Sequence, residues 1–232
     1  MTRSYRLAPA EPIAALNRVK LIECGEPLVD LRLHLPGFKV TRESAVPWAR
    51  EGVADRLKIA RRGLAPYDIG LREAWRSLKR QQFIYDRYFA GLDPLRSLAI
   101  RRRLANRFFA PYDQKAPPGH STGAAIDLWL LDEQGEPIDL SGPGERFKSA
   151  PTFSAKLPER VREMRLLLHD ALLDAGFTNC RDEWWHYSYG DAGWAVRAGE
   201  KTCIYGSAEP PKNEYEERDR AFFEAFVKDP PF

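Results

Sequence analysis

Apolar residues recur with the period of a helix in residues 157–177, the clearest such segment of the chain. One face of this segment carries five apolar residues at helical spacing: Val161, Met164, Leu168, Ala171 and Leu172. Pro158 stands near the start and Gly176 at the end, where these residue types are common at helix boundaries. The pattern predicts a helix over the whole segment.

The same period predicts other helices. Residues 46–63 have an apolar stripe and Pro47 in what would be the first turn. Ser77 can cap a second helix that ends near Gly91, and a third is expected over residues 94–109. The C-terminal tail is expected to form a final helix that docks on the body through three phenylalanines: Phe222, Phe223 and Phe226.

Short segments rich in aromatic and branched residues predict strands. They are residues 67–75, 124–131, 138–140, 183–190, 194–199 and 202–206. The turn DEQGEP between the second and third segments predicts an antiparallel hairpin. Helices and strands alternate irregularly, and the linkers are too short to separate two domains. We therefore predict an α+β fold, a single domain over residues 1–232 with a central, largely antiparallel sheet flanked by helices.

The composition fits a globular protein. Of 232 residues, 44% are hydrophobic and 12% aromatic, enough for a packed core. The 36 basic and 33 acidic residues nearly cancel and leave a formal charge of +3. Two short basic clusters, residues 61–63 and 100–107, are interpreted as solvated helix faces, because they match no nucleic-acid-binding motif and lack interleaved aromatics. We expect no nucleic-acid partner.

The sequence also bears on location. No apolar run approaches the ~20 residues of a membrane span, and the first residues lack the apolar stretch of a secretory signal. Cys24, Cys180 and Cys203 form no CxxC pair, which favours free thiols in a reducing compartment. We expect a cytoplasmic protein that does not associate with membranes. The sequence does not indicate an oligomeric state.

Two of the four histidines form, with one aspartate, a set that suits a metal. His120, Asp127 and His186 offer two imidazoles and a carboxylate, which is typical of a catalytic zinc ion with one position left for water. Glu183, three residues before His186, would lie near the metal without binding it. A carboxylate there can take a proton from metal-bound water and pass it to the departing amine.

The spacing restricts how these residues can meet. Side chains alternate along a strand, so His120 and Asp127, seven positions apart, cannot both reach one metal from a regular strand. A chain reversal at Gly123 would let His120 come from a loop and Asp127 from the strand. A helix would also bring Glu183 and His186 onto one face, but the aromatic residues between and after them favour a strand, with Glu183 at its entrance.

Each of these residues, taken alone, also has an ordinary structural explanation in a loop, a turn, a sheet or at the surface. His34 and His169 have no acidic or histidine neighbour at a useful spacing, and we interpret both as structural. Spacing alone therefore leaves the metal site and the structural roles open.

Two segments, taken in order, resemble a known family. HSTGAAIDL has the pattern His-x-x-Gly-x-Ala-x-Asp-Leu, and EWWHYSYGD contains Glu-Trp-Trp-His followed by an aromatic residue. Together they resemble the signature of the D-alanyl-D-alanine dipeptidases, zinc enzymes related to the vancomycin-resistance dipeptidase and to bacterial D,D-carboxypeptidases. LREAWRSLKRQQFIYD resembles the Asp-x-Tyr-Arg-Pro segment of that family and the helix after it. The resemblance is strongest over about residues 64–190.

The resemblance implies one zinc ion per chain, held by His120, Asp127 and His186, with Glu183 as general base and acid. Arg76 falls where the family has an arginine that stabilises the developing oxyanion, and a guanidinium can donate two hydrogen bonds to such an oxygen. The implied reaction is hydrolysis of D-alanyl-D-alanine or similar short D-amino-acid peptides by zinc-bound water, in the metabolism of cell-wall peptidoglycan. The residues that bind the rest of the substrate are not identified.

The sequence departs from the family pattern in several places. The residues on either side of Arg76 differ, and Pro118 stands where relatives often have serine. Lys148 follows Phe147 where relatives tend to have an acid that receives the ammonium group of the dipeptide. A lysine would repel this group, and Glu145 is the nearby acid that would have to replace the missing one.

Two alternatives therefore stay open. Lys148 favours a D,D-carboxypeptidase that acts on longer cell-wall peptides. A non-catalytic, zinc-stabilised module that binds a wall peptide is the less favoured alternative, because Glu183 and Arg76 are both present.

Overall fold

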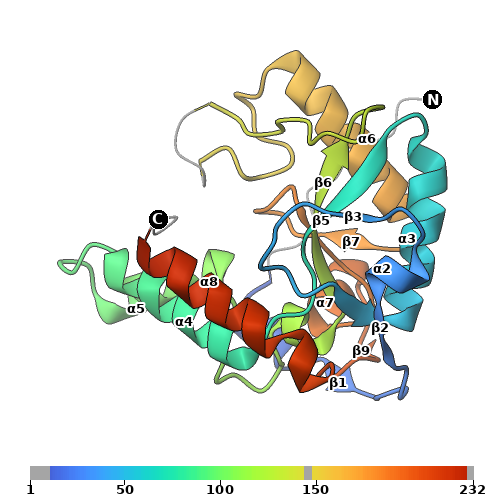
Figure 1. Cartoon of the computed structure of the whole chain (residues 1–232). Helices are drawn as coiled ribbons and strands as arrows, with labels where there is room; N and C mark the ends of the chain where they lie inside the picture. Colours follow the sequence, from blue (N-terminus) through green and yellow to red (C-terminus); the bar gives the residue numbers. More distant parts are fainter. Residues whose placement is uncertain (1–10, 144–147, 229–232) are drawn as a thin grey trace.

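A five-stranded sheet lies at the centre of the computed structural model, which describes residues 11–143 and 148–228 (Figure 1). Its strand order is β3-β5-β6-β8-β7, and two small sheets pair β1 with β9 and β2 with β4. The strands are β1 (Lys20–Leu21), β2 (Leu28–Asp30), β3 (Lys39–Val40), β4 (Trp48–Arg50), β5 (Asp68–Glu73), β6 (Ala125–Leu131), β7 (Thr178–Asn179), β8 (His186–Ser188) and β9 (Thr202–Cys203).

The helices vary from one turn to more than four. The α-helices of the described residues are α1 (Ile13–Leu16), α2 (Leu31–His34), α3 (Glu51–Leu64), α4 (Leu78–Gly91), α5 (Leu98–Phe108), α6 (Glu159–Asp174), α7 (Ala192–Ala198) and α8 (Glu216–Lys228). Two 3-10 helices are η1 (Gly119–Thr122) and η2 (Lys212–Glu214). Within the described ranges, no helix combines the length and the apolar character needed to cross a membrane.

The pairing directions confirm the predicted fold class. β3 runs parallel to β5, whereas the β5–β6, β6–β8 and β7–β8 pairs are antiparallel. Helices and strands are mixed along the chain, so the fold is α+β with a largely antiparallel central sheet.

The two faces of strand β6 have different surroundings. Its residues Ile126, Leu128 and Leu130 are fully buried. Because side chains alternate along a strand, Asp127 and Trp129 point the other way, where they line a cleft. The central strand therefore contributes apolar side chains to the core and a carboxylate to the cleft.

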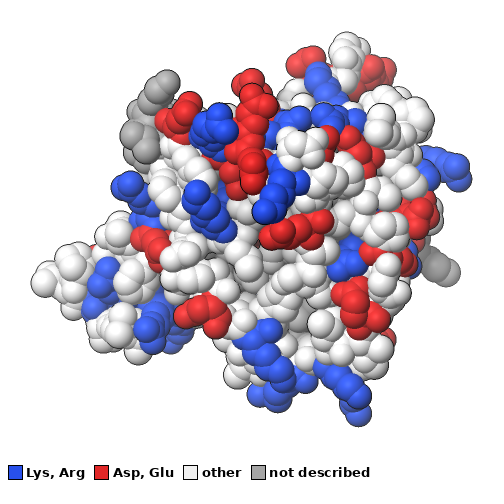
Figure 2. Space-filling view, turned by 60° about the horizontal axis from the view of Figure 1, so that its bottom comes forward, with Lys and Arg blue, Asp and Glu red and all other residues white. Residues whose placement is uncertain are grey.

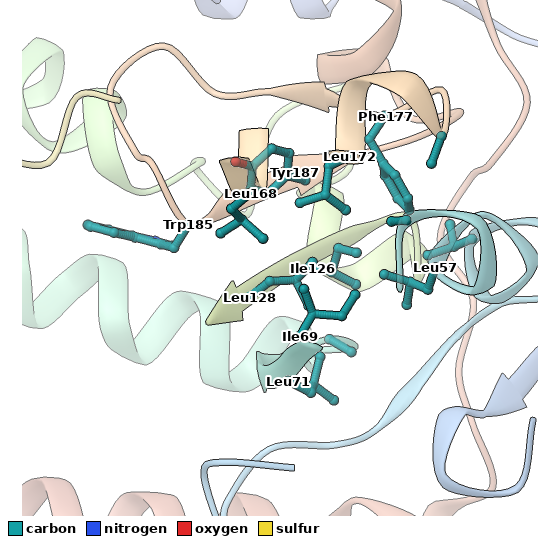
Figure 3. Close-up of a cluster of buried hydrophobic side chains, with 14 of the residues drawn as sticks. Leu57, Ile69, Leu71, Ile126, Leu128, Leu168, Leu172, Phe177, Trp185 and Tyr187 are labelled. Atoms are coloured by element: carbon teal, nitrogen blue, oxygen red, sulfur yellow. The ribbon is translucent and has the colours of Figure 1, made fainter. Parts of the chain in front are cut away.

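Helices α3 and α6 cover the core face of the sheet (Figure 1). Leu57 of α3 and the pair Leu168 and Leu172 of α6 pack with Ile126 and Leu128 of β6 (Figure 3). The buried face of α6 confirms the helix predicted from its apolar period, and Gly176 follows its end with a φ of 93°.

Three helices form an arm on the other side of the sheet, at the left of Figure 1: α4, α5 and α8. We call this unit the helical arm. Phe222 and Phe226 of α8 are buried against Phe83 and Ile84 of α4. Ring centroids of Phe83 and Phe226 lie 5.1 Å apart, edge to face. The predicted docking of the C-terminal helix is confirmed.

Two helices begin later than the sequence pattern predicts. Helix α3 starts at Glu51, because residues 48–50 pair with β2 as an antiparallel strand. Helix α5 starts at Leu98, because the Ser97 side chain accepts a hydrogen bond from the backbone N–H of Ile100 at 3.4 Å. Ser77 caps α4 as predicted.

Two segments predicted as strands have other structures. Residues 194–199 belong mostly to helix α7, since the Asp191 carboxylate caps it by accepting from the Trp194 N–H at 2.7 Å and Gly199 ends it with a φ of 78°. The return segment 138–140 makes a single backbone hydrogen bond to β6, from Ile138 N–H to Leu130 at 2.9 Å, and is not a strand.

The core packing generates a stability prediction. Leu57 is 0% exposed and Ile59, on the same helix, is 54% exposed. We expect Leu57→Ala to lower the free energy of unfolding by about 2–5 kcal/mol, because it leaves a cavity between α3 and the sheet. Ile59→Ala should change it by less than about 0.5 kcal/mol. Urea denaturation of both variants checks this, and equal effects would contradict the assigned core.

Candidate active site

A sharp turn before β6 positions His120. The residue lies in the 3-10 helix η1, and Gly123 then reverses the chain with a φ of 73°. A side chain at Gly123 would also collide with Leu28. His120 therefore approaches from a turn while Asp127 comes from the strand, as the spacing of the motif predicts.

One hydrogen bond fixes the orientation of the His120 ring. Its Nδ1–H donates to the backbone carbonyl of Ala74 at 2.8 Å. The other ring nitrogen, Nε2, then carries a lone pair and lies 3.4 Å from Oδ1 of Asp127. Orientation of a metal-binding imidazole by a backbone carbonyl is common in metalloproteins.

The register of the sheet brings Asp127 and His186 together. Asp127 of β6 is directly opposite His186 of β8 in the antiparallel ladder. Nδ1 of His186 donates to Oδ1 of Asp127 at 2.9 Å. The two imidazoles thus meet at the same carboxylate oxygen.

The three side chains fit a metal ion. One ligand atom from each of His120, Asp127 and His186 lies within 4.8 Å of the other two, and no further group in the described part of the chain meets this condition. Two nitrogens and one carboxylate oxygen suit zinc, which binds such atoms at about 2.0–2.2 Å and keeps a fourth position open in catalytic sites.

Burial and neighbouring charges set the protonation of these ligands. Burial by itself raises the pKa of Asp127, but its contacts with His120 and His186 hold the pKa well below its ordinary value. Burial, together with the Arg76 guanidinium, lowers the pKa of His120. An ionised carboxylate and a neutral imidazole are the forms that coordinate a metal.

Glu183 lies in the turn directly before β8, at the predicted entrance of the strand. Its backbone carbonyl accepts a hydrogen bond from the Asn179 amide at 3.0 Å. Burial lowers the pKa of His186, whereas Asp127 and then the charge of Glu183 raise it, with a net upward shift. Glu183 lines the same cleft as the three ligand residues.

Arg76 directs its guanidinium toward the same group. Nη1 donates to the Gln81 side chain at 2.8 Å, and Nη2 lies 3.9 Å from a carboxylate oxygen of Asp127. Its Nε is buried and has no hydrogen-bond partner among the described residues. The side chain is 11% exposed, so this charge is held largely away from bulk water.

A cleft of about 1080 Å³ contains all these residues. The three ligand residues, Glu183 and Arg76 line its wall. The structure thus brings together the five residues to which the sequence analysis assigns metal binding or catalysis. An open cleft beside a group of metal ligands allows a small substrate to reach the metal position.

A buried acid, Glu73, was missed by the sequence analysis. A β-bulge between Leu71 and Glu73 shifts the register, so that Glu73 is opposite Asp127. Glu73 is 1% exposed and accepts hydrogen bonds from Arg42 at 3.0 Å and Arg80 at 3.1 Å. The signal for it was available, since Glu73 stands at the acidic first position of the Asp-x-Tyr-Arg-Pro pattern.

Helix α8 completes this buried network. Arg80 is 0% exposed, and burial lowers its pKa to about 10 although the Glu73 charge opposes the shift. The Phe222 ring lies 3.9 Å from the guanidinium carbon of Arg80, and Asp219 lies 3.8 Å from its Nη1. Phe222 also lines the cleft, so the C-terminal helix forms part of its wall.

The two other histidines lie elsewhere. His34 contacts Asp55 at 3.1 Å and His169 contacts Asp170 at 3.0 Å, and neither histidine lines the cleft. Lys148 is exposed. Phe147 and Glu145 fall outside the described residues.

Comparison with known proteins gives consistent matches. The model of the peptidase M15 family, described as D-ala-D-ala dipeptidase, matches residues 92–203. A D-alanyl-D-alanine dipeptidase of Synechocystis sp. is 30% identical over 244 residues, which covers 85% of this chain and 98% of that protein. A D-alanyl-D-alanine dipeptidase of Escherichia coli is 35% identical over 87 residues, covering 37% of this chain and 45% of that protein.

A solved structure of VanYB in complex with D-Ala-D-Ala superposes with a TM-score of 0.43 and 15% identity, covering 71% of this chain and 87% of that chain. The sequence match to the cyanobacterial relative extends over nearly the whole of that protein. This chain therefore belongs to the D-alanyl-D-alanine dipeptidase family.

Proposed function

We propose that this chain hydrolyses the peptide bond of D-alanyl-D-alanine, or of a similar short D-amino-acid peptide, with the help of one zinc ion. The observation that carries this proposal is one cleft that holds His120, Asp127 and His186 within 4.8 Å of one another, beside Glu183 and Arg76. Membership of the D-alanyl-D-alanine dipeptidase family supports the substrate.

The three ligands would be Nε2 of His120, Nδ1 of His186 and the carboxylate of Asp127. Held there, zinc would supply a Lewis acid for the scissile carbonyl and for water. The hydrogen bond from His120 to Ala74 supports this assignment, because it leaves Nε2 directed at Asp127. His186 would exchange its proton on Nδ1 for the ion.

Glu183 is the group that moves the proton in this proposal. It would take a proton from the attacking water and deliver it to the nitrogen of the departing amino acid. Its place in the cleft, three residues before the ligand His186, supports the role. Trp184 and Trp185, which are buried, restrict the turn that carries it.

Arg76 is proposed to stabilise the charge that develops on the carbonyl oxygen. Its guanidinium lies 3.9 Å from a carboxylate oxygen of Asp127 and donates a hydrogen bond to Gln81. These two contacts support the proposal, because they orient the guanidinium beside the proposed metal ligands. A donor that is already oriented needs no rearrangement during the reaction.

A second candidate is D,D-carboxypeptidase action on longer peptides. The cleft of about 1080 Å³ favours it, since pockets for drug-sized ligands are about 300–1,000 Å³ and a dialanine is far smaller than such a ligand. The two activities use the same metal centre and differ in what lies on the amino side of the scissile bond.

We also propose a cytoplasmic location. Cys24, Cys180 and Cys203 are free. Disulfides are rare in reducing compartments and common in oxidising ones, so three free thiols support this location.

Replacement of a ligand should lower metal content. We expect wild-type protein to bind one zinc per chain, and His120→Ala to bind zinc much more weakly. Loss of a group that only orients a ligand costs about 10–100-fold in affinity, and loss of the ligand should cost at least as much. His169→Ala, which changes a histidine outside the cleft, is the control. Elemental analysis after dialysis measures both, and equal zinc in the two variants would contradict the site.

Glu183→Gln should retain zinc and lose turnover. An amide cannot accept the proton, and loss of a general base typically lowers the rate by about 10²–10⁴-fold. Glu163→Gln, at a side chain 57% exposed on α6, should behave as wild type. Steady-state hydrolysis of D-Ala-D-Ala by the zinc-loaded variants provides the measurement. An active Glu183→Gln protein would exclude the role of base.

Arg76→Ala should reduce kcat by about 10²–10³-fold, because an oriented donor to the oxyanion is lost. Arg96→Ala, which removes an arginine 54% exposed on the surface, serves as the control. Zinc content should stay the same in both variants. Near-normal kcat in Arg76→Ala would remove this residue from the mechanism.

A further inference from the structure

The cleft extends beyond the metal ligands to the helical arm. Seven residues of helix α5 belong to its lining: Ala99, Arg102, Arg103, Leu104, Asn106, Arg107 and Phe108. Arg102 and Arg103 lie three and four positions after Ala99, on the same side of the helix. The arm therefore presents exposed arginines to the cleft that holds the metal ligands.

The lining of the cleft carries more positive than negative side chains. Among the described residues it includes eight arginines and five acidic residues. Three of the acids are ion-paired with arginines of the same lining, Glu11 with Arg197 at 2.7 Å, Asp182 with Arg107 at 2.6 Å and Asp127 with Arg76 at 3.9 Å, so arginines stay in excess. A bound divalent cation would add further positive charge. An anionic ligand is thus favoured in this cleft over a cationic one.

Arg102 and Arg103 are the arginines of this lining that remain available. Both are exposed, and neither forms an ion pair or hydrogen bond with a residue in the described ranges. Figure 2 shows basic side chains gathered on the arm, which projects to the left. A guanidinium presents a planar set of donors that matches a carboxylate.

The reaction restricts where a longer substrate can extend. A peptide that ends in D-Ala-D-Ala terminates in the free carboxylate of the leaving residue, so any further residues lie on its amino side. The volume of the cleft, about 1080 Å³, provides room for such residues.

We propose that Arg102 and Arg103 bind carboxylate groups on the amino-side extension of a peptide that ends in D-Ala-D-Ala. The preferred substrate is then an N-acylated D-Ala-D-Ala peptide with an anionic extension, and these two arginines determine that preference. The proposal rests on the proposed function, because it assumes hydrolysis at the metal centre of the same cleft.

The test compares three substrates of the zinc-loaded protein: D-Ala-D-Ala, acetyl-Gly-D-Ala-D-Ala and succinyl-Gly-D-Ala-D-Ala. The two acylated peptides differ in one carboxylate. At low ionic strength we expect kcat/KM to be about 3–10-fold higher for the succinyl peptide, mainly through a lower KM, since exposed charge pairs contribute modestly. The ratio should approach one at about 1 M salt, where charges are screened within about 3 Å.

The variant Arg102→Gln/Arg103→Gln should bring the ratio of succinyl to acetyl hydrolysis to about one. This ratio does not depend on the fraction of active protein, so partial unfolding of the variant does not affect it. Arg96→Gln is the matched control, because Arg96 lies between α4 and α5, is paired with Asp93 at 3.5 Å and does not line the cleft. It should keep the wild-type ratio.

Three outcomes overturn the inference and leave the proposed function intact. Either the succinyl and acetyl peptides are cut equally well by wild-type protein, or only the free dipeptide is cut. A preference that persists in the double variant would likewise exclude these arginines as its origin. If zinc-loaded protein cuts none of the three substrates, the proposed function itself fails.

Discussion

A carboxylate withdrawn from water must be surrounded by positive charge or hydrogen-bond donors, and Asp127 imposes this requirement on the middle of the sheet. Its oxygens are approached by His120 from a turn, by His186 from strand β8 and by Arg76 from the segment after strand β5. The same requirement makes the group a good metal site, because a divalent cation satisfies a buried carboxylate more fully than two imidazoles can.

Glu73, on the neighbouring strand β5, is a second buried carboxylate that needs positive charge around it. The bulge in β5 places it opposite Asp127, and Arg42 and Arg80 enclose it. Arg80 is in turn covered by Phe222 of α8. The buried charges of Glu73 and Arg80 therefore connect the sheet to the helical arm. Glu73 also lies 3.9 Å from Nη2 of Arg76, so the same charges join the arm to the candidate active site.

Much of the site could be predicted from the sequence, because its geometry is local to two motifs. The left-handed turn at Gly123 and the strand that carries His186 follow from residue types and spacing. The motif marks Glu73 itself, but the contacts around it could not be predicted in this way, since a bulge and contacts from α8 depend on tertiary packing. Helix α7 was assigned wrongly for a different reason: its aromatic and branched residues outweighed the capping signals of Asp191 and Gly199.

The pairing of β6 with β8 has a consequence for misfolded forms of the chain. A slip by one residue would place Ile126 or Leu128, instead of Asp127, opposite His186, and would turn the aspartate into the apolar interior. Such a slip would disrupt the packed core and the set of candidate metal ligands at the same time. An ion that binds only the correct pairing would select the native form from such alternatives. If the site binds zinc as proposed, zinc availability during biosynthesis should therefore influence how much correctly folded protein accumulates.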